Sequence, residues 1–256
     1  MTTEYTAPAP PPVLPPEPPP TNSFSRIAGV LFAPAKTFAE IARRPDFAIP
    51  LILIILIGYI SVVVMLPRTD YTSILEQQTK QARKQNPNLS EADLARSTKF
   101  IVGIAKVGAW VSPILMVIGY LIMAGLLLVA FRLMGGEGNY KQAFSTTLYA
   151  WLPQVILTLV ATIVVALRGT FDPEQAATLV RSNPAFLVDL KEHPLLFTLL
   201  ASFDVFTIWT VVLLTLGFAA LSKLSRQTSA VIVLVLWAVW IVIKVGFAAL
   251  GTLMGG

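Results

Sequence analysis

Two residues of this 256-residue chain carry charge deep inside apolar segments, Asp204 and Lys244. A charged side chain at the centre of a bilayer costs about 2.5–3.5 kcal/mol on insertion scales, and it usually faces a partner or a water-filled cavity. Asp204 lies nine residues after Leu195, and Lys244 lies nine residues before Leu253. If both segments are helical, each charge therefore lies about 13–14 Å from the same side of the membrane.

The two apolar segments run antiparallel if they are helices, because only the short stretch SKLSRQTS joins them. We therefore predict that Asp204 and Lys244 form one intramembrane pair, held by an ion pair or a hydrogen bond. Two alternatives stay open. Lys244 extends to the interface while Asp204 lines a wet crevice, or Asp204 is a carboxylate coupled to transport.

Other residues that carry chemistry are few. The sequence has no cysteine, which excludes disulfides, thiolate metal sites and cysteine nucleophiles. The single histidine, His193, lies between Glu192 and Pro194, and we interpret it as an interfacial polar residue; a pH-sensitive Glu–His element is the alternative. The motif GGEG at residues 135–138 lacks the lysine of a phosphate-binding loop and predicts a tight turn. We predict a protein that is not an enzyme and holds no metal or cofactor.

Five apolar segments dominate the chain, which is 55% hydrophobic and only 13% charged, against roughly 25% charged residues in soluble domains. A bilayer core of about 30 Å requires about 20 apolar residues in helical form. The segments of this length are residues 47–66, 107–131, 144–167, 195–221 and 230–253. They predict an all-α membrane protein, a bundle of five transmembrane helices with its termini on opposite sides.

The composition divides the chain into three parts. Residues 1–22 hold 9 of the 19 prolines and predict a disordered proline-rich tail. Residues 23–45 predict an amphipathic interfacial segment, and residues 46–256 predict the five-helix domain. The tail has neither the basic residues nor the apolar stretch of a secretory signal. The pair of arginines before the first span favours a cytoplasmic N-terminus and a C-terminus outside.

The segment before the first span has an apolar face and a charged face. On a helical wheel Phe38 and Ile41 share one face, whereas Arg43 and Arg44 fall elsewhere. We predict an interfacial anchor, in which the apolar side chains enter the bilayer and the arginines meet anionic phosphates. The alternative is a helix packed on the other spans. Asp46 follows and is expected to cap the first span.

The connections between spans carry signals for helix starts. Asn139, with Gln142 three residues later, predicts a capping box. Asp172 and Asn183 each precede a proline and predict two short helices in one loop. Ser90, in the motif SEAD, predicts the start of a helix that continues into the second span.

A recognisable spacing surrounds the start of the first span. The stretch LFAPAKTFAEIARRPDFAIPLIL places Phe32, Pro34 and Phe38 in the pattern F-x-P-x-x-x-F, followed by Asp46 and Pro50. The pattern is similar to the one that precedes the first span in bacterial members of the Yip-domain family, the Ypt/Rab-interacting multi-pass membrane proteins. Asp46, Pro50 and Leu51 loosely match the eukaryotic motif D-L-Y-G-P-L of that family.

A second motif lies at the centre of the chain. Tyr149 and Pro153, in YAWLPQVIL, match the family's tyrosine and the proline four residues later, while Leu148 replaces its glycine. GGEGNYKQAF resembles the short glycine-containing loop ahead of the third span. The resemblance covers the chain from about Leu31 to its end. It implies five membrane helices, a cytosolic N-terminus and, in the bacterial branch, a location in the cytoplasmic (inner) membrane.

For the bacterial branch the resemblance implies a membrane protein, and eukaryotic relatives are associated with prenylated Rab GTPases and vesicle budding. We predict a non-enzymatic integral membrane protein of the Yip-domain type that organises membrane partners or bilayer shape. The alternative is a small transporter or channel subunit that uses Asp204 and Lys244. The expected partners are the bilayer with its anionic lipids, other membrane proteins or a second copy. We ascribe the net charge of +5 to topology and lipid headgroups rather than to nucleic acid.

Overall fold

The computed structural model describes residues 22–255 of the chain. Five of its helical segments are long and apolar enough to cross a membrane, by length and composition. These are Ala48–Arg68, Glu91–Leu133, Tyr140–Arg168, Val205–Ser222 and Arg226–Leu253. The predicted five-helix membrane bundle is confirmed. The predicted disordered tail lies outside the described residues except for Asn22, whose side chain caps the first helix.

Ten α-helices and three short 3₁₀ helices occupy the described residues. They are α1 (Ser23–Phe32), α2 (Pro34–Arg43), α3 (Ala48–Met65), η1 (Leu66–Arg68), α4 (Thr72–Gln85), α5 (Glu91–Leu133), α6 (Tyr140–Ala150), α7 (Leu152–Arg168), η2 (Pro173–Thr178), η3 (Pro184–Leu187), α8 (Pro194–Leu200), α9 (Val205–Ser222) and α10 (Arg226–Gly255).

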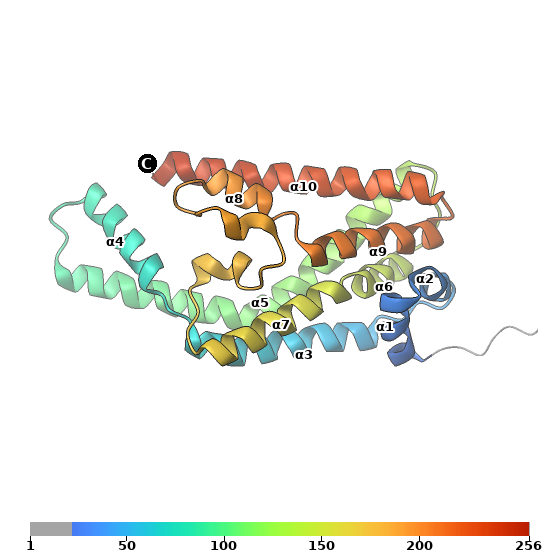
Figure 1. The fold of residues 1–256 in the computed structure, drawn as a ribbon, viewed down its shortest axis with the longest axis horizontal. Coiled ribbons are helices and arrows are strands. Elements are labelled where there is room, and N and C mark those ends of the chain that lie inside the picture. The colour runs from blue at the N-terminus through green and yellow to red at the C-terminus, as the bar shows by residue number, and fades with distance from the viewer. Residues whose placement is uncertain (1–21, 256) are drawn as a thin grey trace, which may run out of the picture.

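The spans run back and forth between two ends of an elongated bundle (Figure 1). α1 and α2, together called the elbow, lie at one end of the bundle, the elbow end. They lie beside the turns 134–139 and 223–225. α4, α8 and the C-terminal end of α10 lie toward the other end, here called the loop end. The elbow and the end of α10 therefore lie at opposite ends of the bundle, as an odd number of crossings requires.

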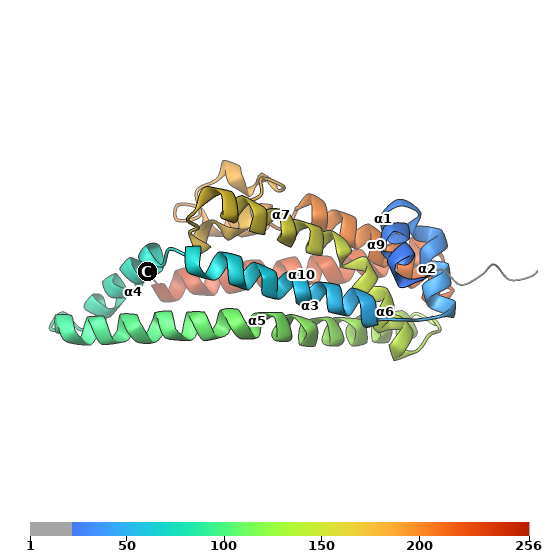
Figure 2. The same ribbon diagram turned by 90° about the horizontal axis from the view of Figure 1, so that it is seen from below.

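α5 is the longest helix of the described residues, and with 43 residues it extends roughly 65 Å. It projects past the other spans at the loop end, where α4 folds back beside it (Figure 2). The Ser90 hydroxyl accepts a hydrogen bond from the Asp93 N–H at 3.1 Å and caps the helix. The predicted helix that starts at SEAD and continues into the second span is confirmed.

The third span consists of two helices, α6 and α7, that meet at Trp151. Pro153 lies in the first turn of α7 and has no N–H to continue the hydrogen bonds of α6, which explains the break. At the start of α6, the Asn139 side chain accepts from the Gln142 N–H at 3.0 Å, and the Gln142 side chain accepts from the Asn139 N–H at 2.9 Å. The predicted capping box is confirmed.

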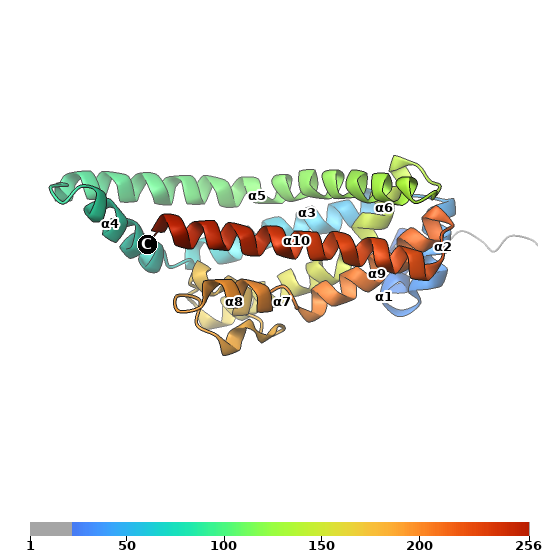
Figure 3. The ribbon, with the colours of Figure 1, turned by 90° about the horizontal axis from the view of Figure 1, so that it is seen from above.

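The fourth span is shorter than predicted. The apolar segment 195–221 is interrupted: α8 ends at Leu200, and α9 begins only at Val205. The Asp204 side chain accepts hydrogen bonds from the Phe206 and Thr207 N–H groups at 2.8 and 3.3 Å, so that it caps α9 while its own backbone is extended. The polar residues of the interruption thus start a new helix. α10 lies along α8 and α9 (Figure 3).

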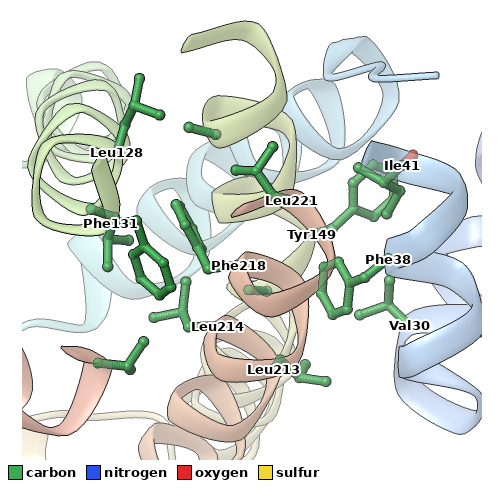
Figure 4. Close-up of a cluster of buried hydrophobic side chains, with 14 of the residues drawn as sticks. Val30, Phe38, Ile41, Leu128, Phe131, Tyr149, Leu213, Leu214, Phe218 and Leu221 are labelled. Atoms are coloured by element: carbon green, nitrogen blue, oxygen red, sulfur yellow. The ribbon is translucent and has the colours of Figure 1, made fainter. Parts of the chain in front are cut away.

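The main buried cluster joins the elbow to the bundle. Figure 4 shows Phe38 and Ile41 of α2 beside Tyr149 of α6 and Leu213 and Phe218 of α9. Contact between α2 and α9 is close because residue 217 is glycine. A Cβ there would lie 3.0 Å from the Phe38 ring and 2.5 Å from the Thr146 side chain.

This packing corrects the predicted interfacial anchor. Phe38 and Ile41 are completely buried in the protein, so their apolar face meets α6 and α9 rather than lipid. Arg43 and Arg44 lie on the exposed side of the elbow, where the wheel placed them. The alternative, a helix packed on the other spans, describes α2 correctly.

Candidate functional sites at the elbow and in an intramembrane crevice

A cluster of polar side chains joins three parts of the chain at the elbow end; we call Ser23, Arg26, Asp46 and Tyr149 the elbow cluster. Asp46 lies in the connection between α2 and α3, Arg26 lies in α1, and Tyr149 lies in α6. The Arg26 guanidinium donates to the Asp46 carboxylate at 2.8 Å, and the Ser23 hydroxyl donates to it at 3.0 Å. The Tyr149 hydroxyl lies 3.2 and 3.3 Å from its two oxygens.

The Arg26 side chain is only 5% exposed, and a buried charge is stable only when it is paired and hydrogen-bonded. Besides Asp46, it donates to the Arg44 carbonyl at 2.9 Å, at the end of α2. The Gln142 amide donates to the Ala42 carbonyl at 2.6 Å and so ties the same end of α2 to α6. The carbonyls that a helix end leaves without partners are therefore used to fix the elbow.

The elbow cluster brings together two of the motifs found in the sequence. Asp46 and Tyr149, 103 positions apart, meet through the carboxylate and the phenol. Pro50 is buried in the first turn of α3, and Pro153 is buried in the first turn of α7. Phe32, in contrast, is 87% exposed.

The roles of Asp46 and Arg26 differ from those expected from the sequence. Asp46 does not cap α3, which has no side-chain cap; its carboxylate is turned to the elbow cluster instead. Sequence reasoning also missed Arg26 as a site residue. The available signal was its position as the only charged residue of Ser23–Phe32, a segment that is otherwise largely apolar.

Asp204 and Lys244 have separate hydrogen-bond partners in the structure. The Asp204 carboxylate, in a side chain that is 5% exposed, accepts from the Ser182 hydroxyl and from the Asn183 amide at 3.4 Å, in addition to the two N–H groups of α9. The Lys244 ammonium donates to the Ser202 hydroxyl at 3.1 Å.

The predicted intramembrane pair is therefore not formed: within residues 22–255 no salt bridge joins Asp204 to Lys244. The physical reason is the interruption of the fourth span. It commits Asp204 to the start of α9 and places Ser202, at the end of the turn after α8, against α10.

Lys244 lines a crevice of about 360 Å³ between the spans. Its walls come from α5, the α6–α7 break, the turn after α8, α9 and α10. Three tryptophans and several aliphatic side chains make most of the lining, and the polar groups are few. The lining includes Trp151, Gln154, Ala201, Ser202, Trp237, Trp240 and Lys244. The Gln154 amide donates to the Thr207 hydroxyl at 3.2 Å within it.

The remaining candidates have structural roles. His193 is exposed and precedes α8, and its N–H donates to the Asp189 carbonyl at 3.0 Å. The predicted tight turn at residues 135–138 is confirmed: Gly135 and Gly138 have positive φ angles of 82° and 115°. Beside it, Lys223 pairs with Glu137 at 2.6 Å. Across the described part of the chain, no group of three or more acidic, histidine or cysteine side chains is placed to hold a metal.

At the loop end, hydrogen bonds join the two long connections. The Asp70 N–H donates to the Phe171 carbonyl at 2.8 Å, and the Ser73 hydroxyl donates to the Asp172 carboxylate at 2.8 Å. The hydroxyl and the N–H of Thr72 both donate to Asp70 and lower the pKa of its carboxyl group. Asp172 and Asn183 cap η2 and η3, so the two predicted short helices are confirmed as 3₁₀ turns.

The comparison with known families decides the class of this protein. The sequence model of the Yip1 domain matches residues 28–248. The chain belongs to the Yip1 domain family. This Yip1 domain protein is also similar to the membrane protein YknW of Bacillus subtilis strain 168, with 24% identity over 228 residues, which cover 89% of this chain and 91% of the relative. No solved structure matches it.

The family match confirms the resemblance read from the sequence motifs and makes this Yip1 domain protein a multi-pass membrane protein. The matched residues include Asp46, Tyr149, Asp204 and Lys244. Arg26 lies just before the matched region, although its side chain completes the elbow cluster.

Proposed function

We propose that this Yip1 domain protein is a non-enzymatic membrane scaffold that organises membrane partners or bilayer shape through its elbow end. The observation that carries the proposal is the fixed position of α1 and α2 on the bundle. A buried ion pair, the Gln142 contact and two fully buried apolar side chains of α2 hold them there. Helices fixed in this way present their outer surface as a rigid platform.

The outer surface of the elbow has the chemistry of a docking surface at a membrane. Phe24 and Phe32 are 71% and 87% exposed, and Lys36, Arg43 and Arg44 are exposed on α2 and just after it. Exposed aromatic side chains and cations together suit contact with anionic lipid headgroups and with the juxtamembrane surface of another protein. With the arginines on the cytoplasmic side, the elbow faces the cytoplasm and the end of α10 faces outward.

The use made of the intramembrane polar groups supports a non-enzymatic role. Asp204 is bound by four donors that start α9 and join it to the preceding loop. Ser61 and Thr162 share a hydrogen bond of 2.7 Å between α3 and α7. These groups assemble helices, and catalysis requires groups that are available to a substrate.

Site-specific crosslinking in native membranes tests the scaffold. A photoreactive phenylalanine analogue is placed at Phe32, and a matched analogue at Leu187, which is 73% exposed at the loop end. We expect discrete adducts with membrane proteins or a second copy from position 32 and not from position 187. Asp46→Ala should weaken these adducts because it releases the elbow. Identical adducts from both positions, or none from position 32, would contradict the proposal.

Reporter fusions test the orientation that the proposal requires. Fusions at the N-terminus and in the turn 223–225 should report the cytoplasm, and fusions at the C-terminus should report the outside. Reports of one compartment from both termini would exclude a membrane path with five crossings.

A second candidate function, a small transporter or channel subunit, is favoured by the crevice at Lys244. It predicts solute or ion flux in liposomes that contain the purified protein, and Lys244→Met should abolish that flux. Liposomes that show no flux for any tested ion would remove this candidate and leave the scaffold.

A further inference from the structure

We infer that the crevice at Lys244 binds an anionic amphiphile from the bilayer, with a carboxylate or phosphate head at Lys244 and Ser202 and an apolar chain along the tryptophans. The inference concerns a ligand site within the membrane and does not rest on the scaffold function proposed for the elbow. Three observations carry it: the charge of Lys244, the lining of the crevice, and the exposure of the face of α10 beside it.

The first observation is the charge of Lys244, for which residues 22–255 show no ion pair. The Lys244 ammonium has three N–H donors, and its hydrogen bond is to the neutral hydroxyl of Ser202. Asp204, the one buried carboxylate of the described residues, is already bound by four donors and makes no salt bridge with Lys244 there. A cation in this environment favours an anion as its partner, because a charge in an apolar medium is stable only when it is compensated.

The second observation is the shape and lining of the crevice. Its volume of about 360 Å³ falls within the range of small-molecule sites, about 300–1,000 Å³. Trp151, Trp237 and aliphatic side chains form the apolar part, while Ser202, Gln154, Lys244 and two threonines of α9 form the polar part. An apolar cavity with a few convergent polar groups and one cation complements a molecule with an anionic head and a hydrocarbon chain.

The third observation is the access to the crevice. Trp240 lines it and is 53% exposed, and its neighbours Val239 and Ile243 are exposed on the same helix. In the apolar window of α10, only 11% of residues are buried inside the protein, so most of this helix faces the bilayer. A ligand that reaches the crevice past Trp240 therefore comes from the membrane phase, which selects an amphiphile over a water-soluble anion.

Quenching of tryptophan fluorescence by brominated lipids tests the inference, because bromine quenches tryptophan on contact. The full-length protein in neutral detergent micelles carries phenylalanine in place of Trp110, Trp209 and Trp240, so that Trp151 and Trp237 report from the crevice. The probes are a dibrominated fatty acid, a dibrominated phosphatidylglycerol and a dibrominated phosphatidylcholine. The first two share an anionic group on an acyl chain and differ in their source, and the third is the neutral comparison.

We expect saturable quenching by at least one anionic probe at a concentration about tenfold below that of the neutral probe, as a charge-assisted contact provides. The anionic probe that binds more tightly identifies the source, a free fatty acid or a phospholipid. Lys244→Met should raise the half-saturating concentration of the anionic probe about tenfold, and Lys244→Arg should retain binding. Lys106→Met, an exposed lysine of α5 outside the crevice, is the matched control and should leave binding unchanged.

Ala201→Leu retains the charge of Lys244, but its larger side chain fills the crevice. This variant tests whether the ligand binds in the crevice even if Lys244→Met does not fold. It should weaken quenching by the anionic probe while circular dichroism and gel filtration stay unchanged. Equal quenching by anionic and neutral probes, or quenching that neither Lys244→Met nor Ala201→Leu reduces, would overturn the inference. Crosslinking at position 32 is a separate measurement that uses no crevice ligand, so failure of either proposal can be told from failure of the other.

Discussion

Removal of the Asp46 carboxylate should release the elbow from the bundle without unfolding the spans. Asp46→Ala deletes the acceptor that Arg26, Ser23 and Tyr149 share. Arg26 then loses the carboxylate that its guanidinium meets at 2.8 Å but keeps its hydrogen bond to the Arg44 carbonyl. Because this ion pair no longer holds α1 to the connection before α3, we expect α1 to separate from the bundle more often.

The size of the effect follows from the burial of the two partners. Loss of one member of a buried ion pair costs about 3–5 kcal/mol. The Asp46 side chain is 31% exposed, so water already screens part of its attraction to Arg26, and we expect a lower cost of about 2–3 kcal/mol. If the cost falls on the contact between elbow and bundle, the open population of the elbow rises about 30- to 150-fold.

Cysteine labelling measures this opening directly, because the natural sequence contains no cysteine. A Val30→Cys reporter places a thiol at a fully buried position of α1, in contact with α2 and the core. Ala124→Cys, fully buried in α5 within a separate cluster, is the matched control. Asp46→Ala should accelerate labelling of Val30→Cys about 30- to 150-fold and leave the labelling rate of Ala124→Cys unchanged.

Two outcomes would refute this reasoning. Equal acceleration at both reporters would mean that Asp46 stabilises the whole bundle rather than the elbow. No acceleration at Val30→Cys would mean that the ion pair contributes nothing to holding α1. Tyr149→Phe should accelerate labelling by only about threefold, since its contacts of 3.2 and 3.3 Å are long and a hydrogen bond contributes about 0.5–1.5 kcal/mol net.

Three further predictions follow from packing and hydrogen bonds within the spans. Gly217→Ala should lower the free energy of unfolding by about 1–3 kcal/mol, because the added Cβ would lie 2.5 Å from the Thr146 side chain. Gly246→Ala, with open space around the added Cβ, should leave the free energy of unfolding unchanged, and melting temperatures in detergent measure both variants. Ser61→Ala removes the hydrogen bond between α3 and α7 and should cost about 0.6 kcal/mol, read from a double-mutant cycle. Asp204→Asn and Lys244→Met should have nearly additive effects on folded yield, and a coupling above about 1 kcal/mol would show a direct interaction between the charges.

The spans could be predicted from the sequence because the thickness of a bilayer imposes a length on each apolar segment. The interruption of the fourth span could not be found in this way, because the residues of α8 are as apolar as those of α9. The signal was Asp204 itself. A carboxylate inside an apolar segment can be stabilised by a charged partner, by water in a crevice or by a helix N-terminus, and the sequence does not choose among these.

The elbow shows a second limit of sequence reasoning. Helical periodicity places Phe38 and Ile41 on one apolar face, and the structure agrees with that face. Periodicity does not distinguish lipid from protein as the medium that covers it, because both are apolar. The covering helix, α9, follows about 180 positions later, and the missing side chain at Gly217 that allows close contact is not visible as a pattern. The meeting of Asp46 with Tyr149 is equally non-local.

The break between α6 and α7 gives the elbow cluster and the crevice a shared structural element. Tyr149 belongs to the cluster and Trp151 lines the crevice, only two positions further along the chain. If the affinity of a crevice ligand depends on the conformation of this break, binding of the ligand must shift the equilibrium between the closed and the released elbow. By linkage, a partner that holds the elbow must then change the affinity of the crevice for its ligand by the same factor. The rate of Val30→Cys labelling with and without the brominated lipid measures that factor, and a ratio of one would mean that the break transmits nothing.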